Sequence, residues 1–247
     1  MKFSVSSLPA NSAVAAEPSS NAAPTVARVR IHAIANGGEG VGRRIGDEHG
    51  MVHFVAGVLP GEIVDVAVEQ VSRSFVRGRV SRVVEASPWR VEPPCRHAHE
   101  CGGCDWQHVD PKAQLELKAQ IVAGQLHCPE LPAAHRHASA TSSGYRRRAR
   151  LHYVRDGSTF RLGFRARRGR SIVDVTACPV LTPELDRAAQ RLRALAPCLP
   201  SEGEMSLFSA GGRVVAGLPG VRDHPTLRAA AQAQLDESLV GITWRGG

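Results

Sequence analysis

Three features are scarce in this 247-residue chain, and each scarcity excludes something. No apolar run approaches the roughly 18 residues that a membrane-spanning helix needs, so we expect no membrane partner. Aromatic residues make up only 4% of the sequence, so a core must rely on Val, Leu, Ile and Ala. Lysine occurs three times against 28 arginines, a bias that a GC-rich genome also produces. The net charge of +8 therefore suggests a polyanionic partner, but the distribution of the charge has to decide.

The first residues resemble a secretion signal only weakly. Pro9, Asn11 and Ser12 interrupt the apolar stretch of such a signal, and Lys2 is its single preceding cation. We therefore expect a disordered polar tail over 1–23 and a cytoplasmic protein. Six cysteines need not form disulfides, because a chain of this length can build its own core. Three thiols close together are more typical of a metal or cluster site in a reducing compartment.

Residues 24–88 carry the pattern of a small all-β domain. Val29, Ile31 and Ala33 alternate with polar residues, which is the period of a half-buried strand. Further alternating segments follow, separated by the Gly-rich stretch 36–42 and a Pro-Gly turn at 60–61. Four or five short strands in this space predict an OB-like β-barrel, since closure removes exposed strand edges.

The segment 93–108, PPCRHAHECGGCDWQH, holds three of the six cysteines. Intervals of five and two residues let Cys95, Cys101 and Cys104 turn inward around one centre, and the two glycines between them relieve crowding. We predict a metal or iron–sulfur site over 89–130, formed by this loop and the helix after it.

A closed site needs a fourth ligand, and the sequence alone leaves Cys128, Cys178 and Cys198 as candidates. Cys178 precedes a proline, as cluster-binding cysteines do elsewhere. Zinc is the alternative to an iron–sulfur cluster, but ribbon-type zinc sites usually combine two C-x2-C pairs and this chain has one. His97 and His99 are interpreted as polar loop residues.

A helix is predicted to follow the cysteines. Asp110 precedes Pro111, which is the pattern of an N-cap followed by a first-turn proline. One apolar face of this helix is expected to carry Leu115, Ala119, Val122 and Leu126.

Residues 131–247 predict an α+β domain. Three antiparallel strands are expected over 145–154, 160–167 and 171–181. A helix over 183–196, capped by Thr182 and ended by Pro197, comes next. A hairpin around 211–212, a helix from Pro225 and a strand over 239–244 complete the prediction. The fold class is therefore mixed: a β-barrel, a cysteine loop and an α+β domain.

Positive charge is concentrated between Tyr145 and Arg170. Ten arginines and a single acid, Asp156, lie in this stretch, and a phosphate backbone is a plausible counterion for them. On a strand, Arg146, Arg148 and Arg150 are expected to share one face. The interleaved aromatic residues Tyr145, Tyr153, Phe160 and Phe164 are candidates for stacking on unpaired bases. The RNA-binding residues we predict are Arg146, Arg147, Arg148, Arg150, Arg165, Arg167 and Arg168.

These segments together resemble the RNA uridine C5-methyltransferases that carry an N-terminal TRAM domain and a 4Fe-4S cluster. The barrel segment shares GEGVGRR and VHFVAGVLPGEIVDVAVEQVSRSFVRGRV, the loop shares CRHAHECGGCDWQH and the following QLELK, and the last domain shares YRRRARL and LGFRARRGRSIVDVTACPVL. The resemblance covers roughly residues 26–195. It implies that the cluster ligands are Cys95, Cys101, Cys104 and Cys178.

The resemblance also implies chemistry for which this chain lacks the residues. In the family a C-terminal Rossmann-like domain binds S-adenosylmethionine, a cysteine attacks C6 of uracil and a carboxylate removes the C5 proton. The Gly-rich stretch 36–42 lies in the barrel segment, the wrong context for a dinucleotide-type fingerprint. Cys128 and Cys198 match no catalytic motif of the family. We therefore expect no catalytic residue here, a SAM-binding domain absent from the chain, and little activity of the chain alone.

Three functions remain at this point. The first is the TRAM and iron–sulfur portion of an RNA uracil methyltransferase, which would act together with a separate catalytic domain. The second is a free-standing RNA-binding iron–sulfur protein, and the third is a zinc-ribbon nucleic-acid protein. Family members with both a TRAM domain and a cluster mostly modify ribosomal RNA, so the resemblance favours rRNA over tRNA.

Overall fold

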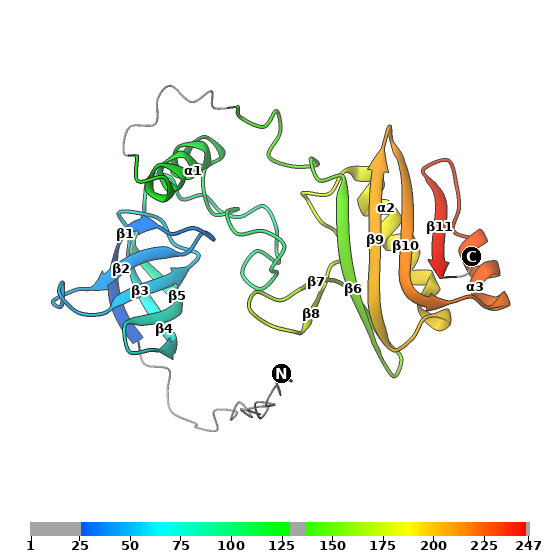
Figure 1. The fold of residues 1–247 in the computed structure, drawn as a ribbon, viewed down its shortest axis with the longest axis horizontal. Helices are drawn as coiled ribbons and strands as arrows, with labels where there is room; N and C mark the ends of the chain where they lie inside the picture. The colour runs from blue at the N-terminus through cyan, green and yellow to red at the C-terminus, as the bar shows by residue number, and fades with distance from the viewer. Residues whose placement is uncertain (1–25, 129–136, 246–247) are drawn as a thin grey trace, which may run out of the picture.

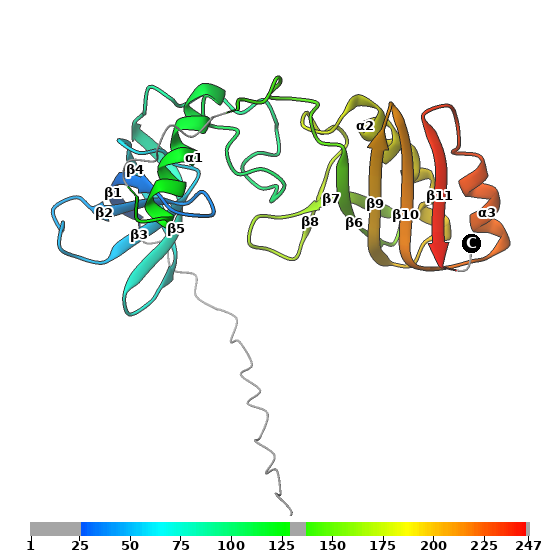
Figure 2. The ribbon, with the colours of Figure 1, turned by 45° about the horizontal axis from the view of Figure 1, so that its top comes forward.

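The computed structural model describes residues 26–128 and 137–245. A β-barrel lies at one end and a six-stranded sheet at the other, and the cysteine loop lies between them (Figures 1 and 2). The tail predicted over 1–23 lies outside the described residues. Within these residues, the structure has no helix with the length and apolar character needed to cross a membrane.

Five strands form the closed barrel that the alternating pattern predicts. They are β1 (Val26–Ile34), β2 (Gly40–Arg44), β3 (Val52–Ala56), β4 (Ile63–Val71) and β5 (Phe75–Glu85). Their order around the barrel is β1-β2-β3-β5-β4, and β3 and β5 run parallel. The inward residues are small and branched, among them Val29, Ile31, Val64 and Val66, which suits a chain with few aromatics.

A buried ion pair fixes the exit from the barrel. The Glu62 side chain is fully buried, and its carboxylate accepts hydrogen bonds from the backbone N–H of Leu59 at 2.9 Å and of Ser87 at 3.2 Å. Arg90 Nη2 donates to the same carboxylate at 2.7 Å and to the Gly57 carbonyl at 2.9 Å. Every oxygen of this buried group is thus partnered, and the chain leaves the barrel toward the cysteine loop in one direction.

Helix α1 (Pro111–Gln125) begins as predicted, because the Asp110 carboxylate accepts from the Lys112 N–H at 2.8 Å. The face predicted to be apolar is not the buried one. Ala113 and Leu117 are buried instead.

The burial of α1 is confined to its first turns. Ala113 and Leu117 pack on Leu59, in the loop between β3 and β4, and on Val109, just before the helix. Farther along, Val122 is 48% exposed and Leu126 is 64% exposed. The spacing of apolar residues was therefore misleading for the second half of α1, where they lie largely in solvent.

The second β-structure is one six-stranded sheet with helices on one side (Figures 1 and 2). Its strands, in the order β11-β10-β9-β6-β7-β8, are β6 (Arg148–Asp156), β7 (Thr159–Arg165), β8 (Ile172–Asp174), β9 (Glu202–Ala210), β10 (Arg213–Arg222) and β11 (Leu239–Arg245). The first two predicted strands and the hairpin at 211–212 are confirmed. The third, predicted over 171–181, is limited to the three residues of β8, because the chain turns at 178–181. The parallel pairing of β10 with β11 follows helix α3 (Pro225–Gln232).

The helix predicted over 183–196 is wrong in its second half. Helix α2 (Pro183–Arg191) passes into a 3₁₀ helix, η1 (Leu192–Cys198), which contains Pro197. A proline has no N–H for an α-helical hydrogen bond, and the tighter 3₁₀ turn accommodates it near the helix end. Thr182 does precede α2, but its side chain makes no capping hydrogen bond.

Candidate functional site

The cysteine loop, residues 93–108, is attached to the sheet by backbone hydrogen bonds. The Gly102 N–H donates to the Arg165 carbonyl at 2.9 Å, and the Arg167 N–H donates to the Glu100 carbonyl at 2.8 Å. These bonds join the loop to the turn between β7 and β8, far away in sequence. The predicted ligand loop is thereby brought to the segment that precedes Cys178.

Cys178 lies in a turn after β8, rather than at the strand end predicted from the sequence. Its N–H donates to Asp186 Oδ1 of α2 at 3.0 Å, which fixes this turn against the helix. Cys178 and Cys101 share one apolar cluster with Val173 and Val175. The structure therefore brings the fourth predicted ligand beside the loop that carries the other three.

Two of the four thiols, Cys101 and Cys178, are affected by burial and by their neighbours. Burial raises the pKa of Cys101 and of Cys178, and the nearby Cys95 and Cys104 thiols raise both pKa values further. The Gly103 N–H, 3.4 Å from Cys101 Sγ, acts in the opposite direction because it stabilises a thiolate. Cys101 is buried and the other three cysteines are half-buried.

The kind of centre that these cysteines hold stays a prediction. Within residues 26–128 and 137–245, no group of three or more Cys, His, Asp or Glu side chains is arranged to hold a metal ion. Cysteine thiolates are ligands of both structural zinc and iron–sulfur clusters, so the residue types alone do not separate the two.

The other cysteine with a described setting lies elsewhere. Cys198 packs against the core of the sheet domain, with Sγ 3.8 Å from the Thr226 carbonyl. Helix α2 lies between it and Cys178 in the sequence, and it is not one of the four predicted ligands.

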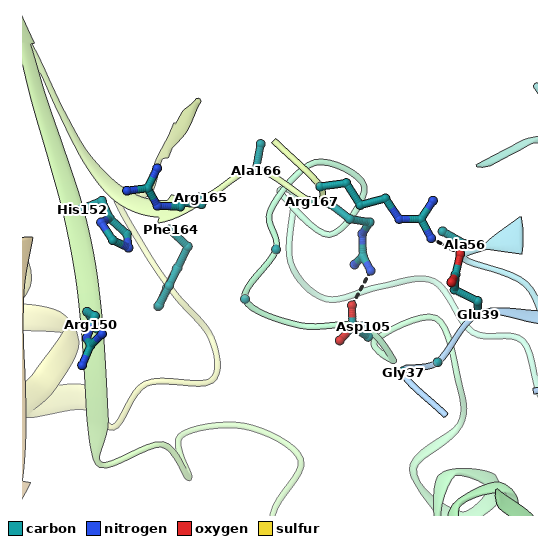
Figure 3. A pocket seen from close by; sticks show the side chains of 14 residues that line it. Gly37, Glu39, Ala56, Asp105, Arg150, His152, Phe164, Arg165, Ala166 and Arg167 are labelled. Carbon is teal, nitrogen blue, oxygen red and sulfur yellow. Dashed lines mark hydrogen bonds and ion pairs between the residues drawn. The ribbon is translucent and has the colours of Figure 1, made fainter. Parts of the chain in front are cut away.

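Next to the thiols, a cavity of about 420 Å³ lies where barrel, cysteine loop and sheet meet (Figure 3). Arg150 and His152 project from β6 on one side, and Glu39 lies on the barrel side (Figure 3). The remaining lining includes Phe164, Arg165, Arg167 and Arg168. We call this cavity the junction pocket. Four arginines and two carboxylates, Glu39 and Asp105, line it.

Two of those arginines are already ion-paired. Arg167 pairs with Asp105, and its Nη2 donates to the Cys104 carbonyl at 2.6 Å (Figure 3). Arg168 pairs with Glu39 and lies 3.5 Å from Glu69, both on the barrel. These side chains tie the hairpin turn to the cysteine loop and the barrel, and their contact with RNA stays a prediction.

Sequence reasoning missed His152 as a lining residue. Burial and then the Arg165 guanidinium lower its pKa, while Glu204 at 3.5 Å opposes them. The alternation of β6 was the available signal, since it places His152 on the same face as Arg148 and Arg150.

The remaining predicted arginines divide between two settings. Arg148 and Arg150 share the uncovered face of β6 and are exposed, as predicted, and Arg147 is also exposed. Arg146 precedes β6 and turns to the cysteine loop, where its Nη2 donates to the Gly103 carbonyl at 2.9 Å. The predicted shared face is therefore wrong for Arg146.

The predicted stacking residues differ in how far they are exposed. Tyr153 is 1% exposed and lies in the core, stacked with Phe160 at 5.8 Å between ring centroids. Burial excludes Tyr153 as a platform for a base. Tyr145 is 49% exposed, and Phe164 lines the junction pocket.

Comparison with known proteins agrees with this layout. Residues 25–81 match the TRAM domain family. The chain is 38% identical over 214 residues to the 23S rRNA (uracil(1939)-C(5))-methyltransferase RlmD of Halomonas elongata, a match that covers 83% of this chain and 44% of that protein. It is 34% identical over 226 residues to the same enzyme of Chromohalobacter salexigens, covering 88% of this chain and 46% of that protein. The chain belongs to the TRAM-containing RNA uridine C5-methyltransferase family.

A solved structure carries the same arrangement. The Pyrococcus abyssi tRNA (uracil-54, C5)-methyltransferase in complex with S-adenosyl-L-homocysteine superposes with a TM-score of 0.62 at 25% identity, over 88% of this chain and 50% of that one. The chain thus spans half or less of the length of these methyltransferases. The absence of a SAM-binding domain stays a prediction. The match covers only part of each enzyme, so the activity of the whole enzyme is a proposal for this chain.

Proposed function

We propose that this chain is the RNA-binding and 4Fe-4S-holding portion of an S-adenosylmethionine-dependent 23S rRNA uracil-C5 methyltransferase. The observation that carries the proposal is that the fold places Cys178 beside Cys101 of the cysteine loop, next to a pocket lined by four arginines. The domain division is 24–88 for the TRAM barrel, 89–130 for the cysteine loop and helix, and 131–247 for the α+β domain. The names of the relatives favour ribosomal RNA as the substrate.

Cys95, Cys101, Cys104 and Cys178 would hold the cluster. When bound, it would supply a covalent tie between the cysteine loop and the segment after β8, between which the Arg96 guanidinium also donates a hydrogen bond to the Thr176 hydroxyl. Because the loop also lines the junction pocket through Gly102, Gly103 and Asp105, that tie would fix one wall of the pocket.

For S-adenosylmethionine the described residues offer no fitting cradle. The Gly-rich stretch 36–42 joins β1 and β2 of the barrel and does not lead into a helix. We therefore derive no methyl-transfer step from this chain. Its arginines bind and orient the RNA backbone, and Phe164 and His152 shape the pocket between them.

The cluster is tested by iron and acid-labile sulfide analysis of anaerobically purified protein. We expect iron and sulfide in equal amounts, and their loss together with the visible absorption in Cys178→Ala. Cys198→Ala is the matched control, because that thiol lies in the sheet core, and it should retain the cluster. Zinc without sulfide would refute the iron–sulfur assignment and leave RNA binding open.

RNA binding is tested by fluorescence anisotropy at several salt concentrations. A protein that makes about six phosphate contacts should lose roughly a thousandfold in affinity between 50 and 200 mM salt. An affinity independent of salt would contradict the proposed RNA-binding role. The rRNA preference is examined in the same assay with a 23S rRNA fragment and a tRNA as competitors.

A further inference from the structure

The face of the sheet that the helices leave uncovered holds a second groove, which shares only Arg150 with the junction pocket. Its volume is about 620 Å³, and β6, β9, β10 and β11 all contribute to it. Strand register places its outward side chains in two rows across the sheet. The first row is Arg148, Phe208 and Val215, and the second is Arg150, Ser206, Gly217 and Thr243.

Phe208 is the unusual residue of this groove. Its strand neighbours Leu207 and Ser209 are buried, whereas Phe208 is 40% exposed in the middle of a sheet. The Arg148 guanidinium lies 5.0 Å from its ring centroid. Val215, directly opposite on β10, is 44% exposed. An aromatic ring and an aliphatic side chain left in water on a flat surface form a platform for another planar, apolar group.

The charge around Phe208 indicates what that group is attached to. Arg148 and Arg150 line the groove, and none of its lining residues is acidic. Among the described residues, no carboxylate lies within ion-pair distance of Arg148, and the Glu204 carboxylate is 3.8 Å from Arg150. Arg213, on the same face at the start of β10, is exposed as well. A planar ligand with attached negative charges matches this surface.

We propose that this groove binds an unpaired nucleotide of single-stranded RNA. The base stacks on the exposed part of the Phe208 ring, with Val215 beside it, and the flanking phosphates pair with Arg148 and Arg150. An unpaired base is required because a duplex hides the faces of its bases. The inference rests on the proposed RNA-binding function and assigns to it a second site, which meets the junction pocket at Arg150.

The test measures binding of a fluorescent single-stranded RNA of about ten nucleotides to the whole chain. Phe208→Leu keeps an apolar side chain of similar bulk but removes the ring, and it should weaken binding about tenfold. Phe208→Tyr should bind as the original protein does. Val240→Ala, an exposed apolar truncation on β11 outside the groove, is the matched control and should have no effect.

A second RNA, identical but with abasic sites, shows whether the ring contacts a base. The abasic RNA should bind the original protein about tenfold more weakly, yet show little further loss with Phe208→Leu, because the same contact is removed twice. Equal affinity of Phe208→Leu and the original protein, or the same abasic penalty in both, would overturn the proposal and favour a protein segment as the occupant. Failure of the original chain to bind any RNA would instead refute the proposed function, and this inference with it.

Discussion

The barrel and the sheet domain are both rich in arginine, but the charge has a different fate in each. Residues 26–88 contain eight arginines and seven carboxylates, whereas residues 145–170 contain ten arginines and one. In the barrel, Asp65 lies 2.8 Å from Arg28 and 3.1 Å from Arg82. On the sheet, Arg148 has no carboxylate partner among the described residues and contacts an aromatic ring instead.

The titration of Asp65 shows the same difference. The hydrogen bond from Arg28 holds its pKa below the usual range, and the pKa of Arg28 is raised in return. Such pairs are exposed and contribute little to stability, but they neutralise the barrel surface. Arginine content alone therefore does not locate an RNA surface. Carboxylates of the barrel neutralise the barrel arginines, whereas the charge on the sheet is left for an external anion.

The largest expected effect concerns the one barrel charge that is fully buried. Glu62→Gln leaves Arg90 without its carboxylate, and breaking a buried pair of this kind should lower the free energy of unfolding by about 3 kcal/mol. Urea denaturation followed by circular dichroism measures it. Glu204→Gln, which removes a half-exposed carboxylate from the sheet, should change stability by less than about 0.5 kcal/mol. Equal losses in both variants would mean that the two regions use charge in the same way.

The second effect is a pH dependence at the junction of barrel and cysteine loop. Burial, and then Arg90, lower the pKa of His108 from 6.5 to about 4. Between these values the unfolded chain binds a proton that the folded chain does not, so stability falls as the pH is lowered from 6.5 toward 4. The loss of unfolding free energy that His108 causes approaches about 3 kcal/mol near pH 4. His108→Gln should flatten the dependence of unfolding free energy on pH in this window, whereas the exposed His49→Gln should not.

How much of this was predictable depends on the range of the interaction. Local patterns gave the barrel strands, the Asp110 cap and the hairpins, because alternation and capping are properties of neighbouring residues. The ion pair between Arg168 and Glu39 spans 129 positions, and no local pattern encodes it. Nor does a local pattern encode the parallel pairing of β10 and β11.

The Phe208 groove was predictable only in part. In EMSLFSA the residues Met205 and Leu207 alternate inward, so an aromatic at Phe208 was bound to face outward. That signal was present in the sequence. Its meaning was not, because the partner Arg148 lies on a different strand and the helices could have covered either face of the sheet.

The third effect separates the two arginine populations directly. Arg148→Gln with Arg150→Gln removes one charge that has no carboxylate partner among the described residues and one that only Glu204 approaches, at 3.8 Å, and it should weaken RNA binding by about 2 kcal/mol, or roughly thirtyfold. It should also reduce the slope of log affinity against log salt by about two, since two phosphate contacts are lost. Arg79→Gln with Arg82→Gln removes the same charge from barrel positions that are ion-paired, and it should change the slope much less. Equal slopes would show that bulk charge, rather than its pairing, governs binding.

The smallest effect is a gain. Glu39 has an 18%-exposed side chain and lies on the barrel, where it neutralises Arg168 and, at 3.3 Å, Arg77. Glu39→Gln would leave Arg77 without its carboxylate partner and would leave Arg168, at the junction pocket, with Glu69 alone. RNA affinity should rise about threefold at low salt, with a salt slope steeper by about one.

Asp47→Asn is the control for that gain, because it makes the same change in net charge in the turn after β2, away from the pocket. If both variants tighten binding equally, the gain comes from net charge and the junction pocket is not part of the RNA surface. If Glu39→Gln weakens binding, the Arg168–Glu39 tie is needed to hold the barrel in position beside the sheet. Only a gain specific to Glu39 supports the view that internal pairing is what keeps the barrel arginines from RNA.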